Sequence, residues 1–281
     1  MSDPPPGASA SSTRVSRMSG STSSAGAYRE RNTTADRALD ILMMFDETEL
    51  AVSATAVAGR LGVARSTAYR YLQSLVASRF LEEAPGGGFR LGLRVLEIAR
   101  LARRSYGLSE IALPAMTALS ERTGETVLLT RRVGDLVVCV DTAESGHRPV
   151  RISYERGSSL PLNAGASALV LLAWSPPEEA RGLLVAAPLK RFTPSTLVDV
   201  DALMERLEAI RAAGFAISRA ELDPDVLGVG APVRDDAGQV VAAVSVAALA
   251  SRVTGEAEAD IVSHVLAAAQ DISDRMAVVA G

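Results

Sequence analysis

Residues 53–77 read SATAVAGRLGVARSTAYRYLQSLVA, and the organisation of the N-terminal part follows from them. Val57 and Leu61 lie four residues apart, which favours a short amphipathic helix. Gly62 ends that helix, because glycine readily adopts the left-handed backbone of a helix end. A further helix is expected to begin near Ser66. Its buried face is expected to contain Ala68, Leu72, Leu75 and Val76.

The flanking residues predict one more helix and a hairpin. A helical apolar pattern runs from Thr33 to Phe45. On the other side, Phe80–Glu83 and Phe89–Leu91 read as short strands around Pro85-Gly86-Gly87-Gly88, which is typical of a β-hairpin with a flexible tip. Three helices followed by a hairpin are the layout of a winged helix-turn-helix.

The third helix leaves polar side chains on its outer face. In a winged helix-turn-helix this helix enters the major groove, where each base pair presents a distinct pattern of donors and acceptors. Arg70 and Gln73 suit base edges, the hydroxyls at the helix start suit phosphate, and Arg90 suits the DNA backbone or minor groove. The candidate DNA-binding residues are Arg65, Ser66, Thr67, Tyr69, Arg70, Gln73 and Arg90. The alternative is a packed three-helix module with polar outer faces.

The net charge of -4 conceals an uneven distribution. Residues 1–105 carry 14 arginines against 10 acidic residues, which gives +4, and residues 106–281 carry 15 basic against 23 acidic residues, which gives -8. Ala51–Leu81 contains Arg60, Arg65, Arg70 and Arg79 and no acidic residue. This local positive surface attracts polyanions whatever the charge of the whole chain.

Composition and charge also predict the domain boundaries. Residues 1–30 form a serine-rich tail that we expect to be disordered. Residues 31–92 form the winged helix-turn-helix, residues 93–108 a linker helix and residues 109–281 a second domain. In that domain, helices are expected at 109–122, from the end of Asn163-Ala164-Gly165 up to Trp174, after Ser175, at 200–213 and at 256–276. Strands are expected at 127–131, 136–142, 148–154, 215–218, 226–233 and 239–248.

The sequence contains few of the histidine and cysteine residues that bind metals or act as catalytic nucleophiles. His147 and His264 lie far apart and Cys139 is the single cysteine, so neither a metal cluster nor a cofactor is expected. Cys139 reads as a small core residue in a protein of a reducing compartment. Apolar runs are too short for a membrane span, so we expect a cytoplasmic location. An enzyme is disfavoured; a metabolite-processing enzyme or binding protein with an accessory basic domain is the alternative.

A pocket for a small molecule is the more plausible feature of the second domain. Along 239–248, Val241, Ala243, Ser245 and Ala247 point to one face, and small side chains leave room above it. Ser167 near a helix N-terminus offers amides and a hydroxyl to an anion. Tight packing of alanine and serine without a cavity is the alternative. Gly228-Val229-Gly230 lies within a strand, where close backbone approach explains it better than a dinucleotide site does.

Several motifs occur in the order typical of one family. In the N-terminal part they are Ala38-Leu39-Asp40-Ile41-Leu42, Ala58-Gly59-Arg60-Leu61-Gly62-Val63, Ser66-Thr67-Ala68-Tyr69-Arg70-Tyr71-Leu72 and Phe89-Arg90-Leu91-Gly92. In the C-terminal part they are Thr123-Gly124-Glu125-Thr126-Val127, Leu160-Pro161-Leu162-Asn163-Ala164, Gly214-Phe215-Ala216-Ile217-Ser218, Ala231-Pro232-Val233 and Val244-Ser245-Val246. With these motifs the chain resembles the IclR family of bacterial transcription regulators over roughly residues 33–277.

The resemblance implies an α+β fold, with a winged helix-turn-helix joined by a linker helix to a GAF-like effector-binding domain. It implies a repressor or activator that binds double-stranded operator DNA as a homodimer or homotetramer under the control of a small molecule. The family's pocket positions correspond to Ala166, Ser167, Ser218, Val226, Gly228, Ser245 and Ala247.

This chain departs from the family pattern at several pocket positions. Asn163 stands where histidine is common, Ser218 where aspartate is common, and Ala247 where a second serine is common. Ala168 and Leu169 replace the usual glycine and lysine. The lining is less polar than in relatives that take small hydrophilic acids. We therefore expect a more apolar or larger effector, a carboxylate or an aromatic compound, rather than a glyoxylate-like one.

Overall fold

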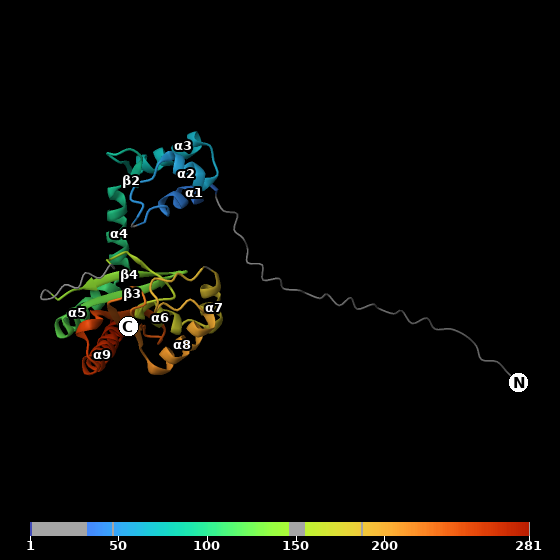
Figure 1. Cartoon of the computed structure of the whole chain (residues 1–281). Coiled ribbons are helices and arrows are strands. Elements are labelled where there is room, and N and C mark those ends of the chain that lie inside the picture. Colours follow the sequence, from blue (N-terminus) through green and yellow to red (C-terminus); the bar gives the residue numbers. More distant parts are fainter. Residues whose placement is uncertain (2–32, 47, 146–154, 187, 281) are drawn as a thin grey trace. The chain divides into compact units, whose positions relative to one another are not determined.

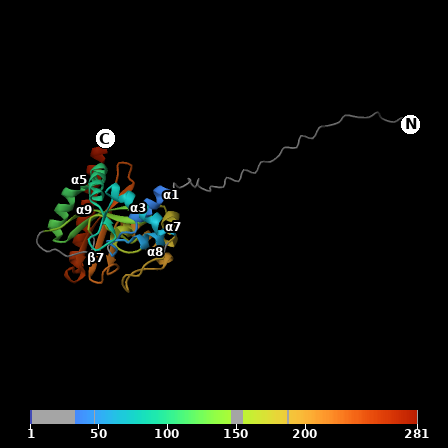
Figure 2. The same ribbon diagram turned by 90° about the horizontal axis from the view of Figure 1, so that it is seen from above.

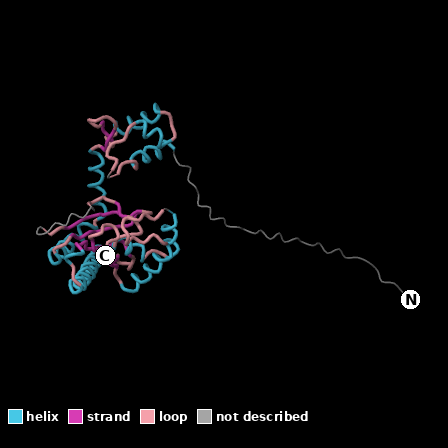
Figure 3. Tube along the Cα trace, in the orientation of Figure 1, coloured by secondary structure: helices cyan, strands magenta, loops and turns pink. Residues whose placement is uncertain are grey.

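The computed structural model describes Met1 and residues 33–280, apart from residues 47, 146–154 and 187 (Figure 1). It divides into two compact units, Met1–Leu96 and Glu97–Gly281. Both units combine helices with strands, as the colours of Figure 3 show. The tail expected at residues 1–30 (Met1 apart) and the strand expected at 148–154 lie outside the described residues.

The N-terminal unit contains three helices and a hairpin in its described part. Its elements are α1 (Thr33–Leu42), α2 (Ala54–Leu61), α3 (Arg65–Ala77), β1 (Leu81–Glu83) and β2 (Phe89–Leu91). The sequence predicted all of them. The first helix was expected to run to Phe45, but α1 ends at Leu42.

The turn between α2 and α3 forms as the sequence predicts. Ser53 caps α2, since its hydroxyl accepts a hydrogen bond of 3.1 Å from the Ala56 N–H. Gly62 follows α2 with a φ of 62°, a left-handed conformation that glycine adopts without strain. The core behind the turn contains Ile41, Val52, Val57, Ala68, Leu72, Leu75, Leu81 and Phe89. Val76, which was expected to be buried, is only partly buried.

The hairpin is anchored to the segment before α2. β1 and β2 pair antiparallel, with Glu83 opposite Phe89. Phe89 also exchanges two backbone hydrogen bonds with Val52, of 2.8 and 2.9 Å. Gly88 has a φ of 84°, and a Cβ there would lie 2.8 Å from the Val52 carbonyl oxygen, so a side chain at this position is excluded.

The predicted linker helix is α4 (Leu93–Tyr106), and the division between the two compact units falls within it. Several apolar side chains of α4 face solvent. Leu93 is 70% exposed, Leu96 66% and Leu101 53%. More than half of each of these side chains therefore lies outside the core of the single chain.

A six-stranded antiparallel sheet forms the centre of the second unit, in the order β5-β4-β3-β8-β7-β6. The strands are β3 (Thr126–Val133), β4 (Leu136–Ala143), β5 (Ser159–Leu160), β6 (Ala216–Arg219), β7 (Val226–Arg234) and β8 (Val240–Leu249). Pairing of β3 with β8 brings together two segments that are distant in the sequence. β5 was not predicted, because two residues are too few for an alternating pattern.

Helices cover both faces of this sheet (Figures 1 and 2). They are α5 (Leu108–Thr123), α6 (Ala166–Ala173), α7 (Pro177–Ala186), α8 (Val200–Ala213) and α9 (Gly255–Ala280), with a short 3₁₀ helix at Ala250–Arg252. α5 and α9 lie together on one face. α6 packs on the other face, with α7 and α8 beside it.

The alternation predicted along 239–248 is confirmed in β8. Val244 and Val246 pack in the core shared with α5 and α9. Ala243 and Ala247 belong to the core shared with α6, and Ser245 contacts α6 directly. The face of small side chains is therefore the face that α6 covers.

Candidate functional site

The polar face of α3 is open to solvent. Arg65, Ser66 and Arg70 are exposed, and Thr67 and Gln73 are half-exposed. Four arginines of the acid-free stretch, Arg60, Arg65, Arg70 and Arg79, are also exposed, and none forms an ion pair with another described residue. The positive charges of these arginines are therefore available to a polyanion, because no described carboxylate is paired with them.

The N-terminus of α3 offers free backbone donors. Ala64 precedes the helix and has no side chain that caps it, whereas Ser53 caps α2. The first amides of a helix have no partner inside the helix, and they bind phosphate where nothing else satisfies them. The uncapped start of α3 suits a contact with a phosphate group.

Two of the predicted DNA-binding residues also contact the protein itself. The Tyr69 ring packs edge-on against the Phe89 ring, with centroids 6.0 Å apart, although 46% of Tyr69 remains exposed. Arg90 Nε donates to Glu82 Oε1 at 2.7 Å across the hairpin. Tyr69 therefore helps to hold the hairpin against α3, and Arg90 must leave or share its ion pair to reach DNA.

A cavity of about 90 Å³ lies between the N-terminus of α6 and the sheet. By this measure one water molecule needs about 10–15 Å³, so the cavity has room for a small organic molecule. Its lining residues are Leu128, Leu160, Gly165, Ala166, Ser167, Ser218, Leu222, Asp223, Val226, Gly228, Ser245, Val246 and Ala247. All seven candidate effector-binding residues are among them.

α6 approaches β7 closely at two glycines, most tightly at Gly230. A Cβ on Gly228 would lie 3.4 Å from the Cβ of Ala166, and a Cβ on Gly230 would lie 3.3 Å from the Ala166 backbone carbon. This confirms the interpretation of Gly228-Val229-Gly230 as a strand that another backbone approaches closely.

Neutral polar groups gather inside the cavity. The hydroxyl oxygens of Ser167 and Ser245 lie 2.7 Å apart, and both residues are buried. Ser218 is also buried and lines the cavity, so its hydroxyl adds a further neutral polar group to the wall.

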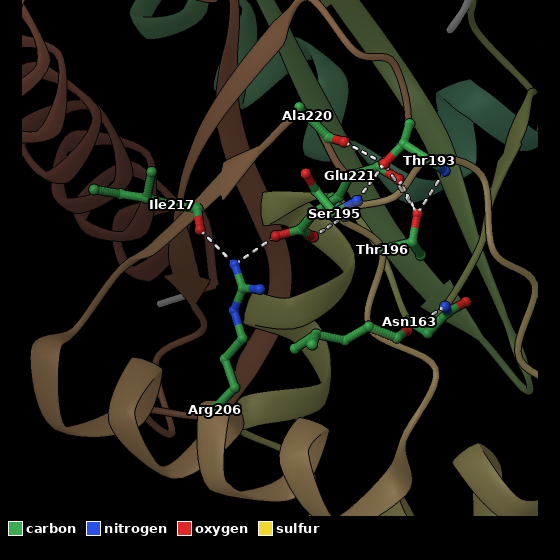
Figure 4. A network of polar contacts seen from close by, with 10 residues as sticks. Asn163, Thr193, Ser195, Thr196, Arg206, Ile217, Ala220 and Glu221 are labelled. Carbon is green, nitrogen blue, oxygen red and sulfur yellow. Dashed lines mark hydrogen bonds and ion pairs between the residues drawn. The ribbon is translucent and has the colours of Figure 1, made fainter.

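A buried ion pair supports the start of α6 (Figure 4). The Glu221 side chain is only 3% exposed, and its Oε1 lies 2.5 Å from the Arg206 guanidinium. Its other oxygen, Oε2, accepts a hydrogen bond of 3.1 Å from the Gly165 N–H. Arg206 also donates to the Ile217 carbonyl at 2.7 Å. Glu221 thereby joins α6, α8 and β6.

Two threonines brace the turn that follows β6. Thr193 Oγ1 donates to the Ala220 carbonyl at 2.5 Å, and Thr196 Oγ1 donates to the Glu221 carbonyl at 2.6 Å. Ala220 has a φ of 54°, which is strained for a residue other than glycine. These bonds hold the turn whose next residues, Leu222 and Asp223, line the cavity.

Sequence reasoning did not identify Glu221, Arg206, Thr193 or Thr196. Their partners lie between 11 and 56 residues away, and no local pattern connects them. It did single out Asn163, whose side-chain amide donates to the Lys190 and Leu197 carbonyls at 3.0 and 2.8 Å. Asn163 therefore holds the segment that carries the two threonines.

Cys139 lies in the core, as the sequence predicts. It is 1% exposed, and burial together with the nearby Asp141 carboxylate raises its pKa to about 12. A thiol with so high a pKa is a poor nucleophile. In the part of the chain that the structure describes, no group of three histidine, cysteine or acidic side chains is placed to hold a metal ion. His147 lies outside that part.

Among the helices of the described residues, none is both long enough and apolar enough to span a membrane.

Two family models match this chain. The model of the IclR helix-turn-helix domain matches residues 34–85, and the model of the bacterial transcriptional regulator IclR C-terminal domain matches residues 101–274. Each compact unit contains the match of one model.

Known proteins show the same likeness. The HTH-type transcriptional regulator XynR of Escherichia coli K12 is 33% identical over 220 residues, which are 78% of this chain and 86% of that regulator. A crystal structure of a chain from Silicibacter sp. TM1040 has a TM-score of 0.78 at 29% identity and covers 86% of this chain and 96% of its own. An IclR homolog from Microbacterium hydrocarbonoxydans, complexed with 4-hydroxybenzoate, has a TM-score of 0.73 at 27% identity and covers 86% of this chain and 98% of its own.

Proposed function

Because this chain belongs to the IclR family of bacterial transcriptional regulators, we propose that it binds double-stranded operator DNA through α3 and the hairpin. A small molecule in the cavity beside α6 controls that binding. The matched relatives are regulators of transcription rather than enzymes. The observation that carries the proposal is the combination, in one chain, of an uncapped helix on an acid-free basic stretch with a cavity lined by buried hydroxyls.

In the proposed complex, α3 lies in the major groove of a half-site. Arg70 and Gln73 read base edges, while Arg65, Ser66 and Thr67 contact phosphate together with the free amides at the helix start. Tyr69 and Arg90 border this face from α3 and the hairpin. The exposed arginines predict strong salt dependence, because each neutralised phosphate releases counterions.

In this proposal the protein acts in the cytoplasm as a homodimer or a homotetramer. Leu39 on α1 is 59% exposed, and Leu93, Leu96 and Leu101 on α4 are more than half exposed. A second copy that covers these leucines would remove a contiguous apolar stripe of α4 from water. Two α3 helices of a dimer would then read two half-sites that lie one or more helical turns apart, with each turn about 34 Å long.

The role proposed for each segment follows the domain boundaries predicted from the sequence. Residues 31–92 bind DNA, residues 93–108 link and residues 109–281 bind the effector, with residues 1–30 as a tail. Ala166, Ser167, Ser218, Val226, Gly228, Ser245 and Ala247 contact the effector. The proposed effector is a carboxylate or an aromatic compound. The homolog complexed with 4-hydroxybenzoate, which is both, supports this class of ligand.

A mobility-shift assay on the DNA that flanks its own gene tests the proposal. The full-length protein should form a complex whose affinity falls steeply with salt, and a ligand that raises its melting temperature should change that complex. The control is DNA of equal length and composition from within an unrelated coding sequence. Equal affinity for both DNAs at every salt concentration would contradict sequence-specific regulation.

A further inference from the structure

We infer that Glu82 is a specificity-determining residue of the DNA-binding surface. Its ion pair with Arg90 withholds the one cation of the hairpin from phosphate groups, except where α3 places the hairpin directly against the DNA. The inference rests on the proposed function, since it concerns the same surface. It is drawn from the charges of the hairpin, from the contact between the two side chains and from the way the strands are held.

The sign of the charge changes where the hairpin begins. Ala51–Leu81 carries four arginines and no acidic residue, whereas Glu82–Leu91 carries one arginine against two glutamates, which gives -1. The hairpin is therefore an acidic margin beside a basic surface. Such a margin repels phosphate groups and lowers the affinity for DNA of any sequence.

The ion pair of the hairpin is open to competition from a phosphate. Arg90 lies directly opposite Glu82 in the antiparallel pair, and its Nε donates to Glu82 Oε1 at 2.7 Å. The two side chains are 50% and 41% exposed, so a phosphate oxygen can reach the guanidinium. An arginine forms charge-assisted hydrogen bonds with carboxylates and with phosphates alike. A phosphate therefore gains Arg90 only where it lies close enough to replace Glu82.

The backbone that carries Arg90 is fixed on both sides. Before it, Phe89 exchanges hydrogen bonds of 2.8 and 2.9 Å with Val52, in the segment that precedes α2. After it, the Gly92 N–H donates to the Phe80 carbonyl at 2.8 Å. Because the strand is held at both points, the ion pair rather than a movement of the hairpin decides whether the guanidinium reaches DNA.

Operator and unrelated DNA differ in what they offer this pair. Binding without sequence preference comes essentially from phosphate contacts, and the protein can then take many positions along the duplex. In the proposed complex, base contacts from Arg70 and Gln73 fix one position and bring the same phosphate group to the hairpin each time. Glu82 therefore weakens binding to unrelated DNA more than binding to the operator, and this difference adds to specificity.

The variant Glu82→Gln tests the inference. Fluorescence-anisotropy titrations of the full-length protein compare two probes, the DNA that flanks its own gene and DNA of equal length and composition from an unrelated coding sequence. Glu82→Gln should tighten binding to the unrelated DNA about two- to fivefold, which is the range of an exposed ion pair. The salt slope on that DNA should steepen by about one, because one more phosphate is neutralised. Affinity for the flanking DNA should rise less, so the preference between the probes falls.

Glu83→Gln is the matched control, because it makes the same change of charge one residue further on. Glu83 lies opposite Phe89, and among the described residues it forms no ion pair. This variant should leave the salt slope and the preference between the probes unchanged. In an Arg90→Ala background, Glu82→Gln should act no more strongly than Glu83→Gln. Equal effects of the two glutamate variants in the otherwise unaltered protein, or a steeper slope without Arg90, overturn the inference.

The two probes also separate this inference from the proposed function. If the unaltered protein prefers the flanking DNA and Glu82→Gln changes neither the slope nor the affinity on unrelated DNA, the inference fails and the proposed function stands. If the unaltered protein binds both probes equally and Glu82→Gln steepens the slope only when Arg90 is present, the restraint on Arg90 stands and sequence-specific regulation fails.

Discussion

The hydroxyl oxygens of Ser167 and Ser245 lie 2.7 Å apart inside the second unit, although 78 residues separate them in the chain. One stands in the first turn of α6 and the other in the middle of β8, so this contact ties the helix to the sheet at the cavity wall. Each hydroxyl is the other's partner in a buried setting, and the two residues are therefore energetically coupled.

Removal of both hydroxyls should cost less than the two single removals added together. Ser167→Ala or Ser245→Ala leaves a buried hydroxyl without its partner, which costs about 1–3 kcal/mol in the free energy of unfolding. The double variant should cost less than the sum of the single ones, by about 1 kcal/mol. Urea denaturation of the four proteins measures this coupling, and strictly additive costs would contradict the hydrogen bond.

Gly165 should not tolerate a side chain. Its φ is 89°, and a Cβ would lie 2.8 Å from Leu222 Cδ1. Gly165→Ala should therefore lower the free energy of unfolding by about 1–3 kcal/mol through backbone strain and should displace Leu222 from the cavity wall.

Gly182 is the matched control for that substitution. It lies within α7, and a Cβ there meets no atom within 4 Å. Gly182→Ala should raise the free energy of unfolding by about 0.5–1 kcal/mol, because alanine is the better helix former. Thermal and chemical denaturation of both variants should thus give changes of opposite sign, and equal changes would show that Gly165 is under no special constraint.

The Arg206–Glu221 pair should be costly to break and cheaper to remove. Arg206→Met leaves the nearly inaccessible Glu221 carboxylate without its cation, for which a loss of about 3–5 kcal/mol is typical. Adding Glu221→Gln should recover part of that loss, since the amide carries no charge but keeps the side chain's shape.

The exposed pair of Arg181 and Asp201 provides the comparison. These side chains are 46% and 79% exposed, so Arg181→Met should change the stability by less than about 1 kcal/mol. A similar loss for Arg181→Met and Arg206→Met would mean that burial does not strengthen the inner pair.

Arg70 and Arg65 should affect DNA binding in different ways. Arg70→Ala should weaken operator binding by about 1–3 kcal/mol and relax the base preference at one position, whereas Arg65→Ala should weaken binding to all sequences and reduce the salt slope by about one. Arg181→Ala, in the second unit, is the charge-matched control. Fluorescence-anisotropy titrations over a series of salt concentrations separate the three outcomes, and unchanged affinity in both α3 variants would refute the groove assignment.

The thiol of Cys139 should stay protonated far into the alkaline range. Burial, and then the Asp141 carboxylate, raise its pKa from 9.0 to about 12. The unfolded chain therefore loses this proton at lower pH than the folded one, so the stabilising effect is complete below pH 9.0 and is lost as the pH rises toward about 12.

Two measurements follow from that shift. Iodoacetamide should alkylate the native protein very slowly at mildly alkaline pH and the urea-unfolded protein quickly, as mass spectrometry will show. The stability of Cys139→Ala should fall less steeply than that of the unaltered protein between pH 9.0 and about 12. Rapid alkylation of the folded protein would mean that the thiol is accessible.

The sequence predicted the elements that short-range patterns define. The Gly62 turn and the apolar stripe of α3 each depend on residues within one or two helical turns, and both form as expected. The alternation along β8 likewise identified the face of small side chains, because strand side chains point to opposite faces in turn. The family motifs then indicated which of these residues would meet, and all seven line one cavity.

Tertiary structure alone decided how the wall of the cavity is held in place. Glu221 reaches back 56 residues to the start of α6, and Thr193 and Thr196 brace a turn more than 20 residues away. The spacing of residue types along the chain does not reveal such partners, because a buried ion pair or a bridging hydroxyl requires only that two groups meet in space. Sequence patterns therefore determined the two-domain scaffold and the position of the cavity, whereas long-range contacts determined how the start of α6 and the turn after β6 are held around it.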